Sequence, residues 1–144
     1  MISIRDAVGK PVIHHETAEQ SGRVRSIAID PTNRMAIAVV TAEGRNSRVV
    51  EWTDVHSVGA DAVIVNHVRD VGPDEDRLVS GSQDPLKKRV LSDRGNEQGS
   101  VIDVIVDDSG LVQSIDVDGV SIAGTRLRGI GSYALVIEAD AAEA

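Results

Sequence analysis

Two stretches of this chain carry the same pattern 72 positions apart, and this repeat limits what the chain can fold into. The first stretch covers residues 54–65 and the second covers residues 126–137. The matched pairs are Val55 and Leu127, Val58 and Ile130, Gly59 and Gly131, Ala62 and Ala134, and Val65 and Ile137. Unrelated segments rarely share a glycine, an alanine and several apolar positions in register. We therefore interpret the chain as two copies of one small unit.

Earlier parts of the two copies also match, at an offset of 77. These pairs are Gly22 and Gly99, Ile27 and Val104, Ile29 and Val106, and Asp30 and Asp107. The offset falls by five towards the end, which predicts a shorter central hairpin in the second copy. We expect a first domain over 1–69, an acidic linker rich in Gly, Ser and Pro over 70–84, a second domain over 85–140, and a frayed tail over 141–144.

The residue types predict β-structure. Val and Ile dominate the apolar residues, Phe is absent, and β-branched side chains favour strands. Turn signals recur between short apolar segments, as at 30–33 and at Asp118-Gly119. One helical turn over 4–7 is expected, with Ser3 as its cap. The fold class we predict is all-β, a barrel or sandwich.

Individual segments follow from the same pattern. We expect a polar loop over 14–22 that Gly22 closes, and a strand over 47–52. The structural turn positions are Gly22, Gly59, Gly99 and Gly131.

Charge and composition exclude several classes of protein. The formal net charge is −8, and most of it lies in the second half, where an excess of carboxylates repels phosphate backbones. The net charge therefore disfavours binding to nucleic acid. The chain has no cysteine, no apolar run long enough for a membrane helix, and no signal-peptide pattern at its start. We expect a cytoplasmic protein without membrane insertion.

The order and spacing of these motifs resemble the PRC-barrel family. In the first copy the resemblance is carried by Gly9-Lys10-Pro11-Val12, by Gly22 to Asp30, and by Trp52 to Val65. In the second it is carried by Lys88 to Leu91, Gly99, Asp107 and Gly129 to Val136. The second copy departs from the first at Gly124, where the first has Trp52, and at Arg126, where the first has Asp54.

The resemblance implies two tandem small β-barrels joined by a short linker and used mainly for protein contacts. Many bacterial and archaeal members of the family are free-standing. The family also includes the cytoplasmic part of the photosynthetic reaction-centre H subunit and the C-terminal domain of a ribosome maturation factor. We expect neither of these specific roles to carry over, because the sequence has no counterpart of the membrane helix of the first protein or of the extra N-terminal domain of the second.

No motif predicts catalysis, a cofactor or a metal. Gly129 to Ala134 has the spelling of a dinucleotide fingerprint, but a strand is expected after it where the fingerprint needs a helix. His14 and His15 are adjacent and point to opposite faces of a strand, and the aspartates near 103–108 and 116–118 lack the order of a calcium loop. We expect a non-enzymatic protein with no cofactor.

A few side chains are candidates for partner contacts. Trp52 and Tyr133 are the only large aromatic residues, and they either anchor an interface or fill the core. The basic residues of interest are Lys87, Lys88, Arg89, Arg126 and Arg128. The first three form a dense run that is suited to an acidic partner or to RNA.

Three hypotheses about function follow. The leading one is a protein–protein interaction or adaptor module with an unidentified protein partner. The second is an RNA-processing or ribosome-assembly accessory protein, and the third is a barrel that binds a small ligand or a metal. A homodimer is plausible in the first case, because small barrels with apolar faces need cover.

Overall fold

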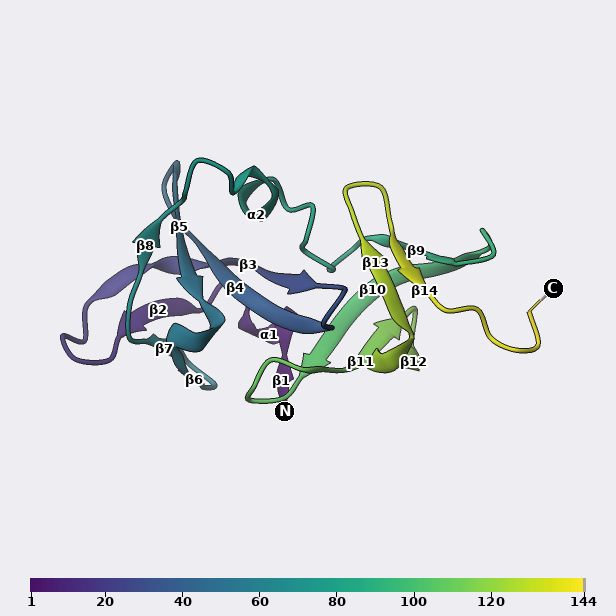
Figure 1. Cartoon of the computed structure of the whole chain (residues 1–144). Helices are drawn as coiled ribbons and strands as arrows, with labels where there is room; N and C mark the ends of the chain where they lie inside the picture. Colours follow the sequence, from purple (N-terminus) through teal and green to yellow (C-terminus); the bar gives the residue numbers. More distant parts are fainter. Residues whose placement is uncertain (144) are drawn as a thin grey trace.

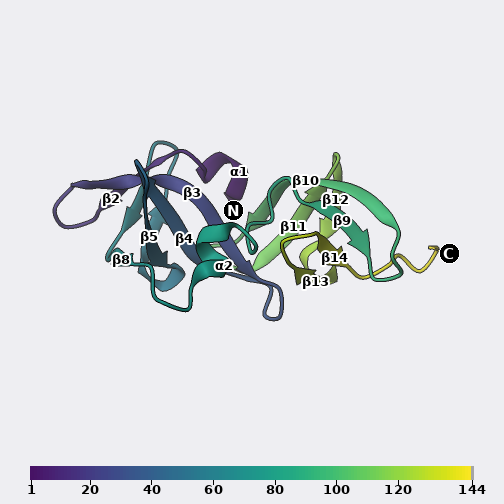
Figure 2. The same cartoon turned by 90° about the horizontal axis from the view of Figure 1, so that it is seen from above.

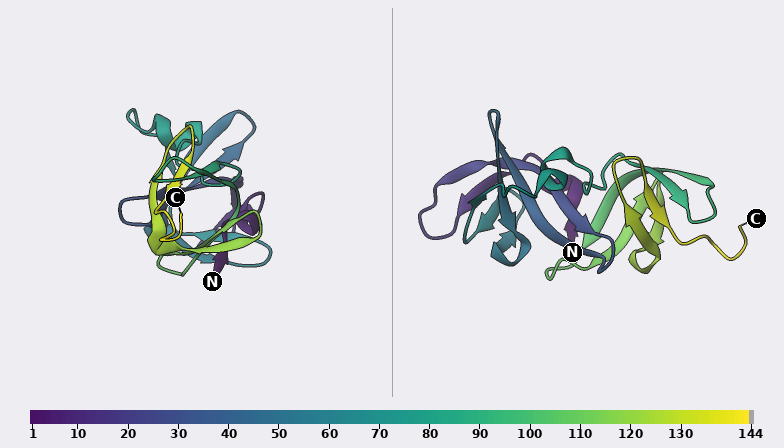
Figure 3. Two further views of the ribbon diagram at one scale, coloured as in Figure 1. Left: turned by 90° about the vertical axis from the view of Figure 1, so that its right-hand side faces the viewer. Right: turned by 45° about the horizontal axis from the view of Figure 1, so that its top comes forward.

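The structure, a computed structural model that describes residues 1–143, consists of two β-sheets that lie side by side (Figure 1). Each sheet has seven strands, and the helices are short. The all-β prediction is therefore confirmed. The two halves follow one another along the long axis of the molecule (Figure 3).

The first sheet has the strand order β6-β7-β2-β3-β4-β5-β8. Its strands are β2 (Pro11–His14), β3 (Gln20–Asp30), β4 (Met35–Glu43), β5 (Asn46–Glu51), β6 (Val55–Val58), β7 (Val63–Val65) and β8 (Arg69–Asp70). A 3-10 helix, η1 (Trp52–Asp54), joins β5 to β6.

The second sheet repeats this order as β12-β11-β10-β9-β14-β13. Its strands are β9 (Arg89–Ser92), β10 (Glu97–Val106), β11 (Val112–Val117), β12 (Val120–Ala123), β13 (Leu127–Ile130) and β14 (Leu135–Ile137). The 3-10 helix η2 (Gly124–Arg126) stands where η1 stands in the first half. In the first half β7 pairs parallel with β2, and in the second half β14 pairs parallel with β9 in the same way.

The start of the chain crosses to the other half. Strand β1 (Ile2–Ser3) pairs antiparallel with β10, and helix α1 (Ile4–Ala7) packs beside that strand. Ser3 caps α1 by accepting a hydrogen bond from Asp6 N, as its sequence position predicts. The first residues therefore join the second sheet, although they lie inside the range expected for the first domain.

A buried carboxylate holds this N-terminal segment in place. Asp103, on β10, is 7% exposed and accepts hydrogen bonds from Ser3 Oγ at 2.5 Å, Arg5 N at 2.9 Å and its neighbour Val104 N at 2.7 Å. Three donors satisfy a group whose burial would otherwise be costly.

The tips of two equivalent hairpins meet where the halves join. Ala36 N donates to Gly110 O at 2.8 Å, and Val112 N donates to Arg34 O at 2.8 Å. Met35 and Leu111 form a bridge between these two bonds. The pair of bonds is reciprocal, as in a contact between two copies related by a twofold axis.

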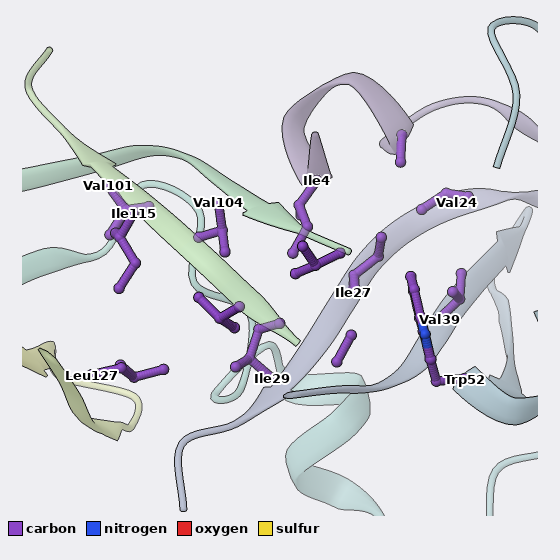
Figure 4. Close-up of a cluster of buried hydrophobic side chains, with 14 of the residues drawn as sticks. Ile4, Val24, Ile27, Ile29, Val39, Trp52, Val101, Val104, Ile115 and Leu127 are labelled. Carbon is purple, nitrogen blue, oxygen red and sulfur yellow. The ribbon is translucent and has the colours of Figure 1, made fainter. Parts of the chain in front are cut away.

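One hydrophobic core runs through both halves. Figure 4 shows Ile4 between Ile27 of β3 and Val104 of β10, with all three buried. The cluster continues into both sheets, which are built mainly from Val and Ile, as the composition predicts. The halves are therefore packed together over a shared core.

The segment between the halves is structured. Helix α2 (Asp76–Ser80) crosses above β4, as Figure 2 shows. Leu78 packs there on the outer side of the first sheet, in a small cluster with Ala28, Ala38, Val40 and Val49. The expected linker over 70–84 thus contains a docked helical turn.

An ion-pair cluster fixes the beginning of this segment. The guanidinium of Arg69 contacts Glu75 at 2.5 and 2.7 Å and Glu51 at 2.7 and 2.9 Å. Glu75 also accepts from Gly72 N at 2.6 Å. The hydrogen bonds from Arg69, followed by that from Gly72, lower the pKa of Glu75 from its ordinary value of 4.5 to about 2.

We expect Glu75→Gln to remove a pH-dependent part of the stability. The pKa of Glu75 is lower in the folded chain, so its contribution is complete above pH 4.5 and is lost as the pH falls towards 2. The difference in unfolding free energy between wild type and Glu75→Gln should therefore shrink over that range, measured by urea unfolding. Asp74→Asn, at an exposed neighbouring carboxyl, is the control, and a difference that stays constant with pH would contradict the assignment.

The four glycine positions divide into two kinds. Gly22 and Gly99 have φ values of +72° and +133°, and a Cβ at either would lie within 2.5 Å of a neighbouring oxygen. Gly59 and Gly131 lie in the β6–β7 and β13–β14 hairpin loops without positive φ or crowding. Only the first pair therefore requires glycine.

Several predicted boundaries need correction. The loop expected over 14–22 is shorter, because β3 starts at Gln20 and Gly22 lies within it at an irregular pairing with β2. The strand expected over 47–52 ends at Glu51, and Trp52 opens η1. Asp118 and Gly119 do form the predicted tight turn, with φ values of 51° and 93°, as a type I′ turn requires.

The end of the chain lies along the β9–β10 hairpin. The carboxylate of Glu143 accepts hydrogen bonds from Ser92 Oγ and from Asn96 Nδ2, the latter at 2.7 Å. These bonds, with that from Ser92 first, lower the pKa of Glu143. The last position of the tail expected to fray, residue 144, lies outside the described residues.

Candidate functional site

The two aromatic candidates lie in different environments. Trp52 is 7% exposed and sits where the halves join, with its Nε1 donating to Asp108 O at 3.4 Å. Tyr133 is 64% exposed in the loop between β13 and β14. Trp52 therefore packs inside the molecule, and Tyr133 is the aromatic residue that a partner can reach.

Arg89 holds the Tyr133 ring in a defined position. Its Nη1 donates to Tyr133 Oη at 2.6 Å, and its Cζ lies 5.0 Å from the ring centroid. Glu97 Oε1 binds the same guanidinium at 3.0 Å. A large exposed ring that is already ordered loses little entropy on binding, which suits an interface anchor.

The basic run at 87–89 is partly occupied by internal contacts. Lys88 Nζ donates to Gly81 O at 2.9 Å, and Arg89 binds Glu97 and Tyr133. Lys87 is exposed in a left-handed turn, with φ +67°, and is equivalent in position to Gly9. The run therefore does not present three unengaged cations in one row.

The remaining two arginines bind the same residue. Arg126 donates twice to Glu138 O, at 2.8 and 3.1 Å, and Arg128 forms an ion pair with Glu138 Oε2 at 2.5 Å. Both side chains are engaged in fixing the chain after β14.

A polar cleft of about 650 Å³ lies between the halves. Its walls come from the β3–β4 turn, from the segment that contains α2, and from the β13–β14 loop that carries Tyr133. The lining residues are Asp30, Pro31, Thr32, Arg77, Ser80, Ser82, Gln83, Ile130, Gly131 and Ser132. The β13–β14 loop that helps to line the cleft also carries Tyr133, and in Figure 1 this loop and the α2 segment both lie at the top of the molecule.

Sequence reasoning did not anticipate this cleft. Arg77 and the serines beside it come from the acidic segment between the repeats, which carries no recognisable motif. Nor did it anticipate that His15 and His56 stack with ring centroids 4.1 Å apart, since they lie far apart in the chain. Only tertiary packing brings these groups together.

Two turns near the junction contain residues of the calcium-loop and dinucleotide-fingerprint patterns considered in the sequence. Asp107 Oδ1 accepts from Ser109 Oγ at 2.6 Å and from Leu111 N at 2.9 Å, and the bond from Ser109 is the main cause of its lowered pKa. Gly129 to Ala134 forms part of an antiparallel hairpin, and the strand β14 follows it. Over residues 1–143 no group of three or more His, Cys, Asp or Glu residues is placed to hold a metal ion.

The fold defines a class of all-β protein in which two sheets share one strand order. Residues 1–71 match the family described as PRC-barrel domain, and this half of the chain therefore belongs to the PRC-barrel family. The matched range ends just after β8 and covers the first sheet. No curated protein matches the chain.

None of the helices in the described part of the chain has the length and apolar character needed to cross a membrane.

Proposed function

We propose that this chain is a non-enzymatic protein–protein interaction module in which the second half is a second PRC-barrel domain. The identical strand order of the two sheets supports a tandem arrangement. The packed junction supports a module that presents its surfaces in a fixed relative orientation, because the two halves share one core.

The observation that carries the proposal is the ordered, exposed Tyr133, which follows the cleft residue Ser132 in the β13–β14 loop. The ring is 64% exposed, and its hydroxyl accepts a hydrogen bond from Arg89 Nη1 at 2.6 Å. A partner segment that enters the cleft would contact polar groups of both halves, including Ser132, the residue next to Tyr133 in the chain. Aromatic anchors with a polar surround are typical of protein interfaces.

The alternative RNA-accessory function is less well supported. It depends on the run at 87–89, and two of its three cations are bound within the chain. The formal charge of −8 also opposes binding to a phosphate backbone.

Affinity capture from a lysate of the source organism, with and without nuclease, tests the proposal. We expect wild type to retain a defined set of proteins after nuclease treatment. Tyr133→Ala should lose that set, and Tyr133→Phe should retain most of it, because Phe keeps the ring over Arg89 and loses only the hydroxyl contact. A set that vanishes with nuclease would instead support the RNA-accessory function.

A further inference from the structure

The strand orders of the two sheets end in four strands, and three of these are protected against pairing with another chain. Strand β1 lies off this order and has only two residues, which is too short to pair stably with another chain. β6 and β13 each contain a register irregularity with their neighbour, and such bulges protect an edge. β8 has only two residues, and both are charged. Charge, bulges and short length are the usual means by which proteins block edge pairing.

The fourth outer strand, β12, has none of these features. Its residues Val120-Ser121-Ile122-Ala123 are uncharged and pair with β11 in an unbroken register of four. Val120 is 61% exposed. Within residues 1–143 no further strand pairs with its outer side.

The first half shows what this position accepts. β5 is the equivalent of β12, and its outer side is covered by β8, which runs antiparallel. There Arg48 pairs with Asp70 at 3.3 Å, and Glu51 pairs with Arg69 at 2.7 Å. In β12 the residues at these two positions are Val120 and Ala123, so the charges that select β8 are absent. An occupant of the β12 edge should accordingly be an uncharged antiparallel strand.

We propose that the occupant is β12 of a second copy of this chain, which rests on the proposed function as an interaction module. β12 is itself an uncharged strand with apolar residues at alternate positions. In an antiparallel pair with Ser121 on the twofold axis, Ser121 faces Ser121 and each Val120 faces Ile122 of the partner copy. Directly opposite residues then lie on the same face, as an antiparallel pair requires. The result is one continuous sheet across two copies, with an isologous contact.

Sedimentation velocity over a range from about 10 μM to about 1 mM tests this pairing. Three facing residue pairs within β12 bury less than the roughly 1,200 Å² of a standard interface, so a weak dimer is expected. Ser121→Lys places two ammonium groups opposite each other, and we expect it to weaken dimerisation at least about tenfold. Ser57→Lys, at an exposed position of the bulged strand β6, adds the same charge and should leave dimerisation unchanged. Chemical shift changes with concentration should be confined to β12 and its neighbours.

The outcomes separate this inference from the proposed function. A chain that stays monomeric at all concentrations, or a dimer equally strong in Ser121→Lys, would overturn the pairing. Capture of the partner proteins by Ser121→Lys would show that the interaction function stands without the dimer. A third outcome is a monomeric wild type that captures partner proteins which Ser121→Lys fails to capture. This outcome would show that β12 pairs with a strand of another protein, and it would also overturn the second-copy assignment.

Discussion

Trp52→Ala should destabilise the protein by about 3–5 kcal/mol, because it removes a large buried side chain and leaves a cavity that the surrounding side chains fill only in part. Trp52 is 7% exposed and packs against the hairpin turn of the other half at Gly110, near the hydrogen bond to Asp108 O. The resulting cavity would lie at the junction. Urea unfolding followed by circular dichroism measures the loss, and we also expect a broader transition as the halves become less strongly coupled.

Tyr133→Ala is the control for this substitution. It removes the only other large aromatic side chain from a position that is 64% exposed, so we expect a loss below about 1 kcal/mol. Equal losses in the two variants would show that Trp52 is not part of the shared core.

Ile4→Ala should destabilise the second half of the molecule, although residue 4 belongs to the first repeat in sequence. Ile4 is fully buried between β3 and β10, and its truncation should cost about 2–5 kcal/mol. Its loss would also loosen β1, whose residues pair with Val106 and Ile105. Hydrogen exchange measured residue by residue should show faster exchange in the amides of β10.

Val8→Ala provides a matched comparison close in sequence. Val8 follows α1 and is 38% exposed, so its truncation removes little buried area. Protection of β10 that is unchanged in Ile4→Ala would mean that the N-terminal segment does not stabilise the second sheet.

Local patterns in the chain were sufficient to predict much of the architecture. The Val- and Ile-rich composition, the matched positions 72 and 77 apart, and the Asp118-Gly119 turn predict short strands in two similar sets. The structure has the same strand order in both sheets, and Ser3 caps α1. These features depend on interactions between residues close in sequence, so their signals are local.

The candidate contacts were harder to assign, because side chains that look alike in sequence have different distant neighbours. Trp52 and Tyr133 were equivalent candidates, and packing buries one and exposes the other. Lys88 and Arg89 form a basic run, but contacts to Gly81, Glu97 and Tyr133 engage them. Exposure and pairing depend on where the rest of the chain lies.

The sequence alone therefore determined that the chain is β-rich and predicted two similar sets of strands, because periodicity and turn chemistry are short-range properties. Only the tertiary structure decided that β1 crosses to β10, that the hairpins at Met35 and Leu111 meet, and that β12 is left as an open edge. An apolar residue has no intrinsic preference for one half over the other, since the hydrophobic effect is non-directional. Specific hydrogen bonds and the shape of the shared core select the partner.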